Sequence, residues 1–307
     1  MGMTIPEAYG GFGLSYSFLV ALMEEMGRHL FSAPYFSSVC LGANALLLGG
    51  TESQKETFLP DIASGKKRAT LAYLEPDGTW GEKAVHATAK ASSDGYVLNG
   101  TKAFVLDGHT ADIIIVAAKS DDGLGLFLVP AETSGVKTSH TPTMDQTRKQ
   151  ASIELNNVSL PSDALIGSFQ DGQQILDQTL QLASVALAAE QLGAAERCLE
   201  TAVEYSKTRV QFGRAIGSFQ AIKHKCADMM VKVESARSAA YYAGWVASEM
   251  PEELPLAAAQ AKSYCSEAFF FCAAENIQIH GGIGFTWEHE AHLYFKRASA
   301  TQTLLGT

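Results

Sequence analysis

Three kinds of sequence feature are scarce in this chain of 307 residues, and each absence excludes a class of protein. The five cysteines form no CxxC pair and have no histidine at metal-ligand spacing: Cys40, Cys198, Cys226, Cys265 and Cys272. The sequence therefore indicates neither a metal site nor a disulfide framework. We interpret most of these cysteines as small core residues of a protein in a reducing cytoplasm.

Long apolar runs and positive charge are also lacking. No apolar run reaches the roughly 18 residues that cross a bilayer, and the first residues do not have the basic and apolar regions of a secretory signal. The formal net charge is −10, and the basic runs Gly65–Arg68 and Lys223–Lys225 are short. Because no basic stripe is available to neutralise phosphates, we expect binding to neither nucleic acid nor a membrane.

Hydrophobic periodicity divides the chain into three parts. Residues 13–66 have helical spacing, with an apolar helix expected over Leu41 to Leu48 and the next helix capped by Thr51 or Ser53. From Arg68 to Pro161, short β-branched runs alternate with turn signals, which is typical of a compact antiparallel barrel or sandwich. A period of 3.6 then returns in four long segments, at about residues 171–211, 217–249, 255–280 and 287–305.

These patterns predict an α+β multidomain fold. We expect an N-terminal helical domain over residues 1–66, a β domain over 67–165 and a C-terminal four-helix bundle over 166–307. With 47% hydrophobic residues, the chain has enough apolar material for more than one core.

The most informative stretch, from Thr208 to Gln220, joins the first two bundle helices and has the sequence TRVQFGRAIGSFQ. Arg209 and Phe212 are three residues apart, so on the last turn of a helix a guanidinium and an aromatic face point at one ligand. Taken alone, Arg209 also suits a solvated or ion-paired arginine at the negative end of a helix dipole.

A second motif, QIHGGIGF, runs from Gln278 to Phe285. The bare backbone at Gly281 and Gly282 allows an anion to approach closely, although a glycine here is also the usual way to end a helix. Together the two motifs indicate a site for a phosphate-bearing cofactor.

In this order and spacing, the two motifs resemble the acyl-CoA dehydrogenase family of flavoproteins, and the resemblance extends over essentially the whole chain. It implies FAD as cofactor, an acyl-CoA as substrate and an electron-transfer flavoprotein as electron acceptor. It also implies a homo- or hetero-oligomer with a related acyl-CoA dehydrogenase subunit, because the glycine segment reaches across a dimer to the adenosine end of a neighbour's flavin. The implied cofactor contacts are Arg209, Gln211, Phe212, Phe219, Gln220, Gln278, Gly281 and Gly282.

The N-terminus departs from the family pattern. Ile5 to Gly11 resembles a loop that family members reach only after two or three helices. We therefore expect a shortened N-terminal domain, either because the gene start is displaced or because the protein is naturally short.

The positions that serve chemistry in the family are also altered. There a glutamate removes the α-proton of the thioester while hydride leaves the β-carbon for flavin N5. The two positions that relatives use for this glutamate correspond to Leu305 and Ala183, and neither side chain accepts a proton. Glu190 is an alternative base, but we favour a structural or interface carboxylate at this position.

Positions near the flavin ring have changed as well. The family threonines that serve the ring correspond to Leu106 and Leu74. The contacts offered to a neighbour's cofactor are thus retained, whereas those for this chain's own flavin ring and thioester are lost.

Three hypotheses follow. The one we favour is a subunit of a heteromeric acyl-CoA dehydrogenase that helps to oxidise an acyl-CoA to its 2-enoyl form. The second is a self-sufficient homo-oligomer with Glu190 or another group as base, and the third is a flavin-free structural or regulatory subunit. The sequence does not specify the acyl group and is compatible with fatty, branched, dicarboxylic and steroid side-chain acyl groups.

Overall fold

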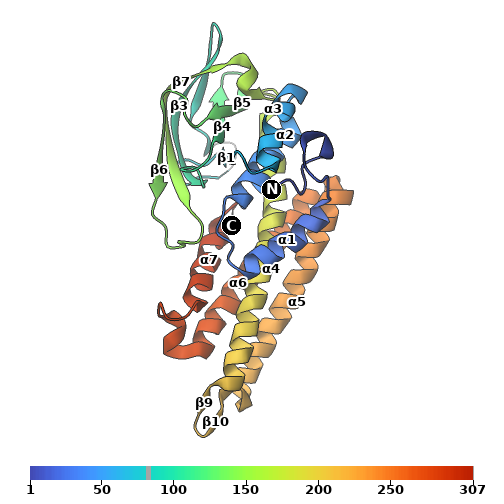
Figure 1. The fold of residues 1–307 in the computed structure, drawn as a ribbon, viewed down its shortest axis with the longest axis vertical. Coiled ribbons are helices and arrows are strands. Elements are labelled where there is room, and N and C mark those ends of the chain that lie inside the picture. Colours follow the sequence, from blue (N-terminus) through green and yellow to red (C-terminus); the bar gives the residue numbers. More distant parts are fainter. Residues whose placement is uncertain (81–83, 307) are drawn as a thin grey trace. The chain divides into compact units, whose positions relative to one another are not determined.

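A computed structural model describes residues 1–80 and 84–306 of the chain (Figure 1). The described residues form two compact units. The first comprises Met1–Leu14, Ala33–Thr143 and Arg148–Ala183, and the second comprises Ser15–Ser32, Met144–Thr147 and Ser184–Thr307. Helix α4, Gly172–Thr208, contributes residues to both units. The units reflect packing rather than chain order, so the domain boundaries at residues 66 and 165 stay a prediction.

The first unit begins with short helical elements: η1 (Glu7–Tyr9), the π-helix η2 (Phe36–Ala43), α2 (Asn44–Gly49) and α3 (Glu52–Ala63). The helix predicted over Leu41 to Leu48 is therefore π-helical in its first part and α-helical in its second. The predicted cap is confirmed at Thr51, whose Oγ1 accepts from Gln54 N at 3.2 Å while Gln54 Oε1 accepts from Thr51 N at 2.9 Å.

Eight strands of the first unit form one sheet: β1 (Ala69–Ala72), β2 (Thr88–Ser92), β3 (Gly95–Leu106), β4 (Ile113–Ser120), β5 (Gly123–Pro130), β6 (Val136–Thr141), β7 (Gln150–Pro161) and β8 (Leu165–Ile166). The short helix η4 (Ser162–Ala164) precedes β8. The strand order is β6-β7-β3-β2-β4-β5-β8, and β1 pairs with β4. Val116, Phe127 and Ile153 lie at the centre of the core that covers this sheet.

The predicted β domain is confirmed, but the expectation of purely antiparallel pairing is wrong. Strands β1 and β2 both pair with β4 in parallel, so the sheet is mixed. No closed barrel forms among the strands that the structure describes. Hydrophobic alternation identifies a strand but not the direction of its neighbour, and the buried run Ile113–Val116 suits either pairing.

The second unit is helical. It contains α1 (Tyr16–Arg28), the later part of α4, α5 (Gln220–Glu249), α6 (Leu254–His280) and α7 (Ala291–Thr303). The connecting segments hold the strands β9 (Val210–Gln211) and β10 (Arg214–Ala215) and the short helices η5 (Ile216–Ser218), η6 (Pro251–Glu253) and η7 (Gly281–Phe285). The predicted four-helix bundle is confirmed, and α1 joins it.

Helices α1 and α4 cross closely at two glycines. A Cβ atom at Gly27 would lie 1.8 Å from the carbonyl oxygen of Glu190, and one at Gly193 would lie 1.8 Å from that of Glu24. The arrangement is reciprocal. On each helix, a glutamate carbonyl contacts the glycine of the other helix, and three residues later a glycine contacts the glutamate carbonyl of the other helix. Any larger side chain at either position would force the helices apart.

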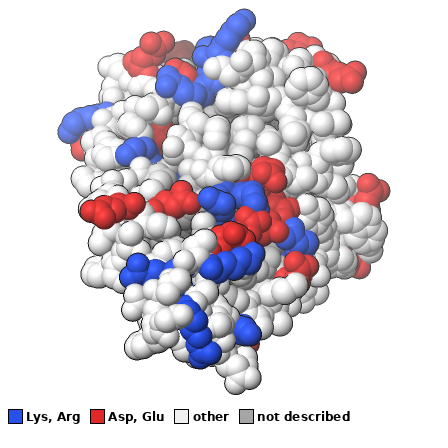
Figure 2. Space-filling view, turned by 60° about the horizontal axis from the view of Figure 1, so that its bottom comes forward, with Lys and Arg blue, Asp and Glu red and all other residues white. Residues whose placement is uncertain are grey.

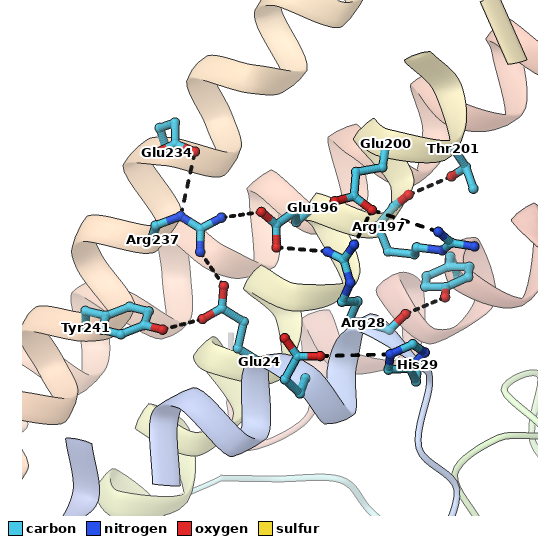
Figure 3. A network of polar contacts seen from close by, with 12 residues as sticks. Glu24, Arg28, His29, Glu196, Arg197, Glu200, Thr201, Glu234, Arg237 and Tyr241 are labelled. Carbon is cyan, nitrogen blue, oxygen red and sulfur yellow. Dashed lines mark hydrogen bonds and ion pairs between the residues drawn. The ribbon is translucent and has the colours of Figure 1, made fainter. Parts of the chain in front are cut away.

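An ion-pair network lies beside this crossing and links α1, α4 and α5 (Figure 3). The Glu196 carboxylate forms ion pairs with the guanidinium of Arg237 at 2.6 Å and with that of Arg28 at 3.2 Å. Arg28 also pairs with Glu200. Glu24 pairs with Arg237 and accepts from Tyr241 Oη at 2.6 Å, which raises the pKa of Tyr241 to about 12. The network therefore joins the three helices through half-buried charges.

No helix in the part of the chain that the structure describes has the length and apolar character needed to cross a membrane.

Candidate cofactor-binding site

The first predicted motif forms a β-hairpin, not a helical turn. Helix α4 ends at Thr208, and β9 pairs antiparallel with β10 around Phe212 (φ 55°) and Gly213 (φ 77°). The prediction that Arg209 and Phe212 share the last turn of a helix is therefore wrong. Two successive left-handed residues make the tight turn that best matches the twist of a hairpin, and helical periodicity gives no warning of it.

The hairpin presents its functional groups outward. Phe212 is 91% exposed, and Arg209 and Gln211 are also exposed. Among the described residues, Arg209 has no ion pair. Its main chain is fixed, because its N–H donates to Tyr205 O and its carbonyl accepts from Ile216 N, both at 2.8 Å. The backbone of Arg209 is thus fixed, while its guanidinium is exposed and able to bind a ligand.

Phe219 and Gln220 lie directly after the hairpin. The Phe219 ring receives the Arg214 guanidinium at 4.1 Å and meets the edge of the Phe212 ring at 6.1 Å between centroids. Gln220 is exposed and begins α5. The five predicted contacts of the first motif are therefore brought together around one turn.

The second predicted motif is an open stretch of backbone. Helix α6 ends at His280, and Gly281 follows with φ 64° and ψ −144°, a conformation that is essentially confined to glycine. A Cβ atom added at Gly281 or Gly282 would meet nothing within 4 Å. Gln278, on the last turn of α6, is exposed. A ligand can therefore approach this backbone closely.

An aromatic stack links the two motifs. The His280 ring lies 4.2 Å from the Tyr205 ring on α4 and 4.3 Å from the His289 ring, between centroids. His280 Nδ1 lies 2.8 Å from Asn276 O, and burial lowers the pKa of this histidine. These contacts suit a packing residue that ties the end of α6 to the end of α4.

Sequence reasoning missed a groove of about 700 Å³ beside this stack. It is lined by Arg197, Leu199, Glu200, Thr201, Val203, Glu204, Tyr205, Thr208, His280 and His289. Most of these residues recur at intervals of three or four along α4, a helical-face pattern that could have revealed it. Positive groups here are neutralised, since Arg197 lies 3.3 Å from Glu290, and Figure 2 likewise shows charges of both signs interspersed on the face drawn.

The base positions contain no ionisable group. Ala183 is fully buried in α4, and Leu305 follows α7 in a left-handed conformation with φ 64°. In the first unit, Leu74 and Leu106 are buried apolar residues. Neither base position therefore holds a proton acceptor, and neither of the two positions that correspond to family threonines holds a hydroxyl.

Glu190, the alternative base, is held in a buried ion pair. Its Oε1 lies 2.6 Å from Arg297 Nη1, and both side chains are almost completely buried. Arg297 Nε also lies 2.8 Å from Asp145 Oδ2, and Arg297 donates to Thr147 Oγ1. Sequence reasoning did not anticipate Arg297 as a partner, because the pair joins residues far apart in the chain.

These features define a class of protein. It is a helical-bundle α+β protein with an outward arginine, an exposed aromatic ring and bare glycine backbone. Arg209 lacks a carboxylate partner in the described chain, and space stands open beside Gly281 and Gly282, so the residues present fit a phosphate-bearing dinucleotide.

The particular family follows from comparison with known proteins. Family models match in sequence: the acyl-CoA dehydrogenase N-terminal domain over residues 1–66, the middle domain over 70–158 and the C-terminal domain over 170–307. The chain is 36% identical over 304 residues to acyl-CoA dehydrogenase IpdE2 of Mycolicibacterium smegmatis. The alignment covers 99% of this chain and 79% of that protein. The chain belongs to the acyl-CoA dehydrogenase family, whose members are FAD-dependent oxidoreductases acting on the CH–CH bond of acyl-CoA.

Two solved structures extend the comparison. Butyryl-CoA dehydrogenase from Megasphaera elsdenii superposes with a TM-score of 0.95 at 32% identity, covering 100% of this chain and 83% of that one. The ChsE4–ChsE5 complex from Mycobacterium tuberculosis gives a TM-score of 0.89 at 32% identity, covering 98% and 79%.

Proposed function

We propose that this chain is one subunit of a heteromeric acyl-CoA dehydrogenase and that it shares FAD with a related subunit. Together the subunits oxidise the Cα–Cβ bond of an acyl-CoA to the 2-enoyl form, and an electron-transfer flavoprotein takes the electrons. The observation that carries the proposal is a contrast within the chain: its outward cofactor contacts are open, while its base positions hold Leu305 and Ala183.

Each outward contact has a defined task in this proposal. The Arg209 guanidinium donates hydrogen bonds to a phosphate, and the open backbone at Gly281 and Gly282 allows a polar part of the cofactor to approach. The exposed Phe212 ring covers an apolar or aromatic face of the cofactor, with Phe219 set against its edge. The amides of Gln211, Gln220 and Gln278 donate to or accept from polar cofactor atoms. When bound, FAD supplies the hydride acceptor.

The proton acceptor comes from the partner subunit. Within this chain Glu190 would have to leave Arg297 before it could serve as a base, and that would strand a charge in the interior. The buried pair supports a structural role for Glu190 and argues against the self-sufficient homo-oligomer. The similarity to a solved ChsE4–ChsE5 complex supports assembly with a second, related chain.

Co-expression with a related subunit tests the proposal. The purified complex should show a flavin absorbance spectrum, and an acyl-CoA should bleach it anaerobically. The isolated chain provides the control: by equilibrium dialysis it should bind FAD much more weakly than the complex does. A stable complex that contains no flavin and is reduced by no acyl-CoA would overturn the proposal in favour of a structural subunit. Tight FAD binding and bleaching by the isolated chain would instead favour the homo-oligomer.

A further inference from the structure

A buried lysine closes the C-terminal end of α7. Lys262, on α6, is only 7% exposed. Its Nζ donates to Ser266 Oγ at 3.0 Å, to the carbonyl of Gln302 at 3.0 Å and to the carbonyl of Gly306 at 3.3 Å. No carboxylate lies within ion-pair distance of Lys262 among residues 1–80 and 84–306. The ammonium is thus satisfied almost entirely by main-chain carbonyls at the end of a helix.

The carbonyls at this helix end are all accounted for. The last four carbonyls of a helix have no partner within it, so each needs one from elsewhere. In α7 each of the last four carbonyls accepts one hydrogen bond. Ala300 O accepts from Thr303 Oγ1 at 3.3 Å, Thr301 O from Gln191 Nε2 at 3.2 Å, Gln302 O from Lys262 Nζ at 3.0 Å and Thr303 O from Gly306 N at 3.4 Å. Two of these four partners are side chains from other helices, and the cation suits the negative end of the helix dipole.

Ser266 joins the two foreign side chains. Its Oγ accepts from Lys262 and lies 3.0 Å from Gln191 Nε2 and 3.2 Å from Gln191 Oε1. Helices α4 and α6 therefore hold the end of α7 through one connected polar group.

The turn that Lys262 closes is strained. Leu305 has φ 64° and Gly306 has φ 108°. A left-handed leucine is uncommon and persists only where its surroundings hold it. Lys262 donates to the carbonyl of Gln302 before Leu305 and to that of Gly306 after it. One ammonium therefore holds the backbone on both sides of the strained residue.

We propose that Lys262 is a positioning residue, whose ammonium fixes the backbone of the turn from Gln302 to Gly306 and thereby sets the direction of the side chain at position 305. This is the position that the family resemblance assigns to the base. The atoms that Lys262 binds in this turn are main-chain carbonyls, so these contacts do not depend on which side chain stands at position 305.

The surroundings make this contact sensitive to pH. The ionisable group that acts on Lys262 is Cys265 on its own helix, while α4 and α7 present the amide of Gln191 and main-chain oxygens. The charged neighbours of those residues, Glu190 and Arg297, are paired with each other. Burial lowers the pKa of Lys262 to about 8. Because the buried site disfavours the charged amine, opening the turn to solvent, where the amine regains its ordinary pKa, becomes less favourable as the pH rises above about 8.

Hydrogen–deuterium exchange of the C-terminal peptide tests the proposal without flavin or partner, so its outcome is separate from that of the shared-site proposal. Protection factors, corrected for the intrinsic effect of pH, are compared between pH 6.5 and 9.5. In the unmodified chain, protection at Gly306 should rise as the pH passes about 8, while the protection of α4 and α5 peptides stays unchanged. A flat profile would overturn the proposal.

Two matched variants complete the test. Lys262→Met removes the charge and should lower protection of the turn at least about tenfold at every pH, as expected for loss of a charge-assisted hydrogen bond. Lys262→Arg stays charged throughout and should show no rise in protection between pH 6.5 and 9.5. If Met protects as well as Lys, the proposal fails. Should either variant fail to fold, the pH profile of the unmodified chain still decides.

Discussion

The two ends of helix α7 satisfy their polar groups in opposite ways. Before α7 begins, the glycine backbone of η7 is open, and Phe285 and Trp287 are exposed. After it ends, Lys262, Gln191 and Thr303 bind the last carbonyls, and Glu190 and Arg297 are paired one to two turns earlier. The first end is built to be completed by another molecule, whereas the second is completed by the chain itself.

Two arginines give the sharpest form of this comparison. Replacing Arg297 by Met should lower the free energy of unfolding by about 3–5 kcal/mol, because the buried carboxylates of Glu190 and Asp145 would lose the cation that both of them bind. Replacing Arg209 by Met should change it by less than about 0.5 kcal/mol, since this side chain is exposed. Urea unfolding followed by circular dichroism measures both. Equal losses would mean that the exposed hairpin and the closed end of α7 do not differ as described.

The closed end should also reveal itself through pH. Burial lowers the pKa of Lys262 from 10.5 to about 8, so the unfolded chain binds more protons than the folded one between these values. Its contribution to stability is therefore present above about pH 10.5 and is lost as the pH falls to about 8, a change of about 3 kcal/mol. The measurement is the difference in unfolding free energy between the unmodified chain and Lys262→Met across this range.

That difference is needed because other groups titrate nearby. Burial raises the pKa of Cys265 and of Cys272 to about 12, and these thiols act in the opposite direction as the pH rises. Cys272 is present in both proteins and so cancels, whereas Cys265 interacts with Lys262 and is therefore replaced by alanine in both proteins. A difference that does not change with pH would show that Lys262 is not desolvated.

The exposed hairpin that follows α4 should respond in cofactor affinity. Arg209→Met should weaken FAD binding by the complex at least about tenfold, since a hydrogen bond to a charged group contributes about 1.5–3 kcal/mol. Lys207→Met is the matched control, because Lys207 lies nearby but already pairs with Glu204 at 2.6 Å. Fluorescence titration with FAD gives both affinities, and equal effects would remove Arg209 from the cofactor site.

Substitutions at the two glycines of the open end should separate the effect of backbone strain on stability from the effect of steric access on cofactor binding. Gly281→Ala should cost about 1–3 kcal/mol in stability, because its backbone conformation is essentially confined to glycine. Gly282→Ala should cost little, since a Cβ atom there meets nothing. Both should reduce FAD affinity by obstructing the anion's approach. Thermal unfolding and FAD titration together check this, and unchanged affinity in both variants would exclude the segment from the site.

Much of this fold could be read from the sequence. The four bundle helices were predicted to within a few residues, because long amphipathic segments are separated by Gly and Pro breaks such as Met250–Pro255. The hairpin at Phe212 was missed because a short turn contributes too few residues to change a helical period. The parallel pairing of β1 with β4 was missed because strand direction depends on contacts far apart in the chain.

The assignment of the cofactor contacts stays a prediction, although the sequence does reveal the motifs that contain them. Arg209, Phe212 and Gly281 were found as motifs, and the structure places them with open space or exposed surface. Two features were not predictable: the ion pair between Glu190 and Arg297, and the hydrogen bonds from Lys262 to the carbonyls on either side of Leu305. Both join residues on different helices, and no local pattern in the sequence records which helix faces meet.

Native mass spectrometry of the intact complex tests the central claim most directly, because it reports subunit identity, stoichiometry and flavin count together. A shared cofactor predicts two kinds of related subunit and one FAD for each unlike pair. An assembly of this chain alone, with one FAD for every copy, would contradict it.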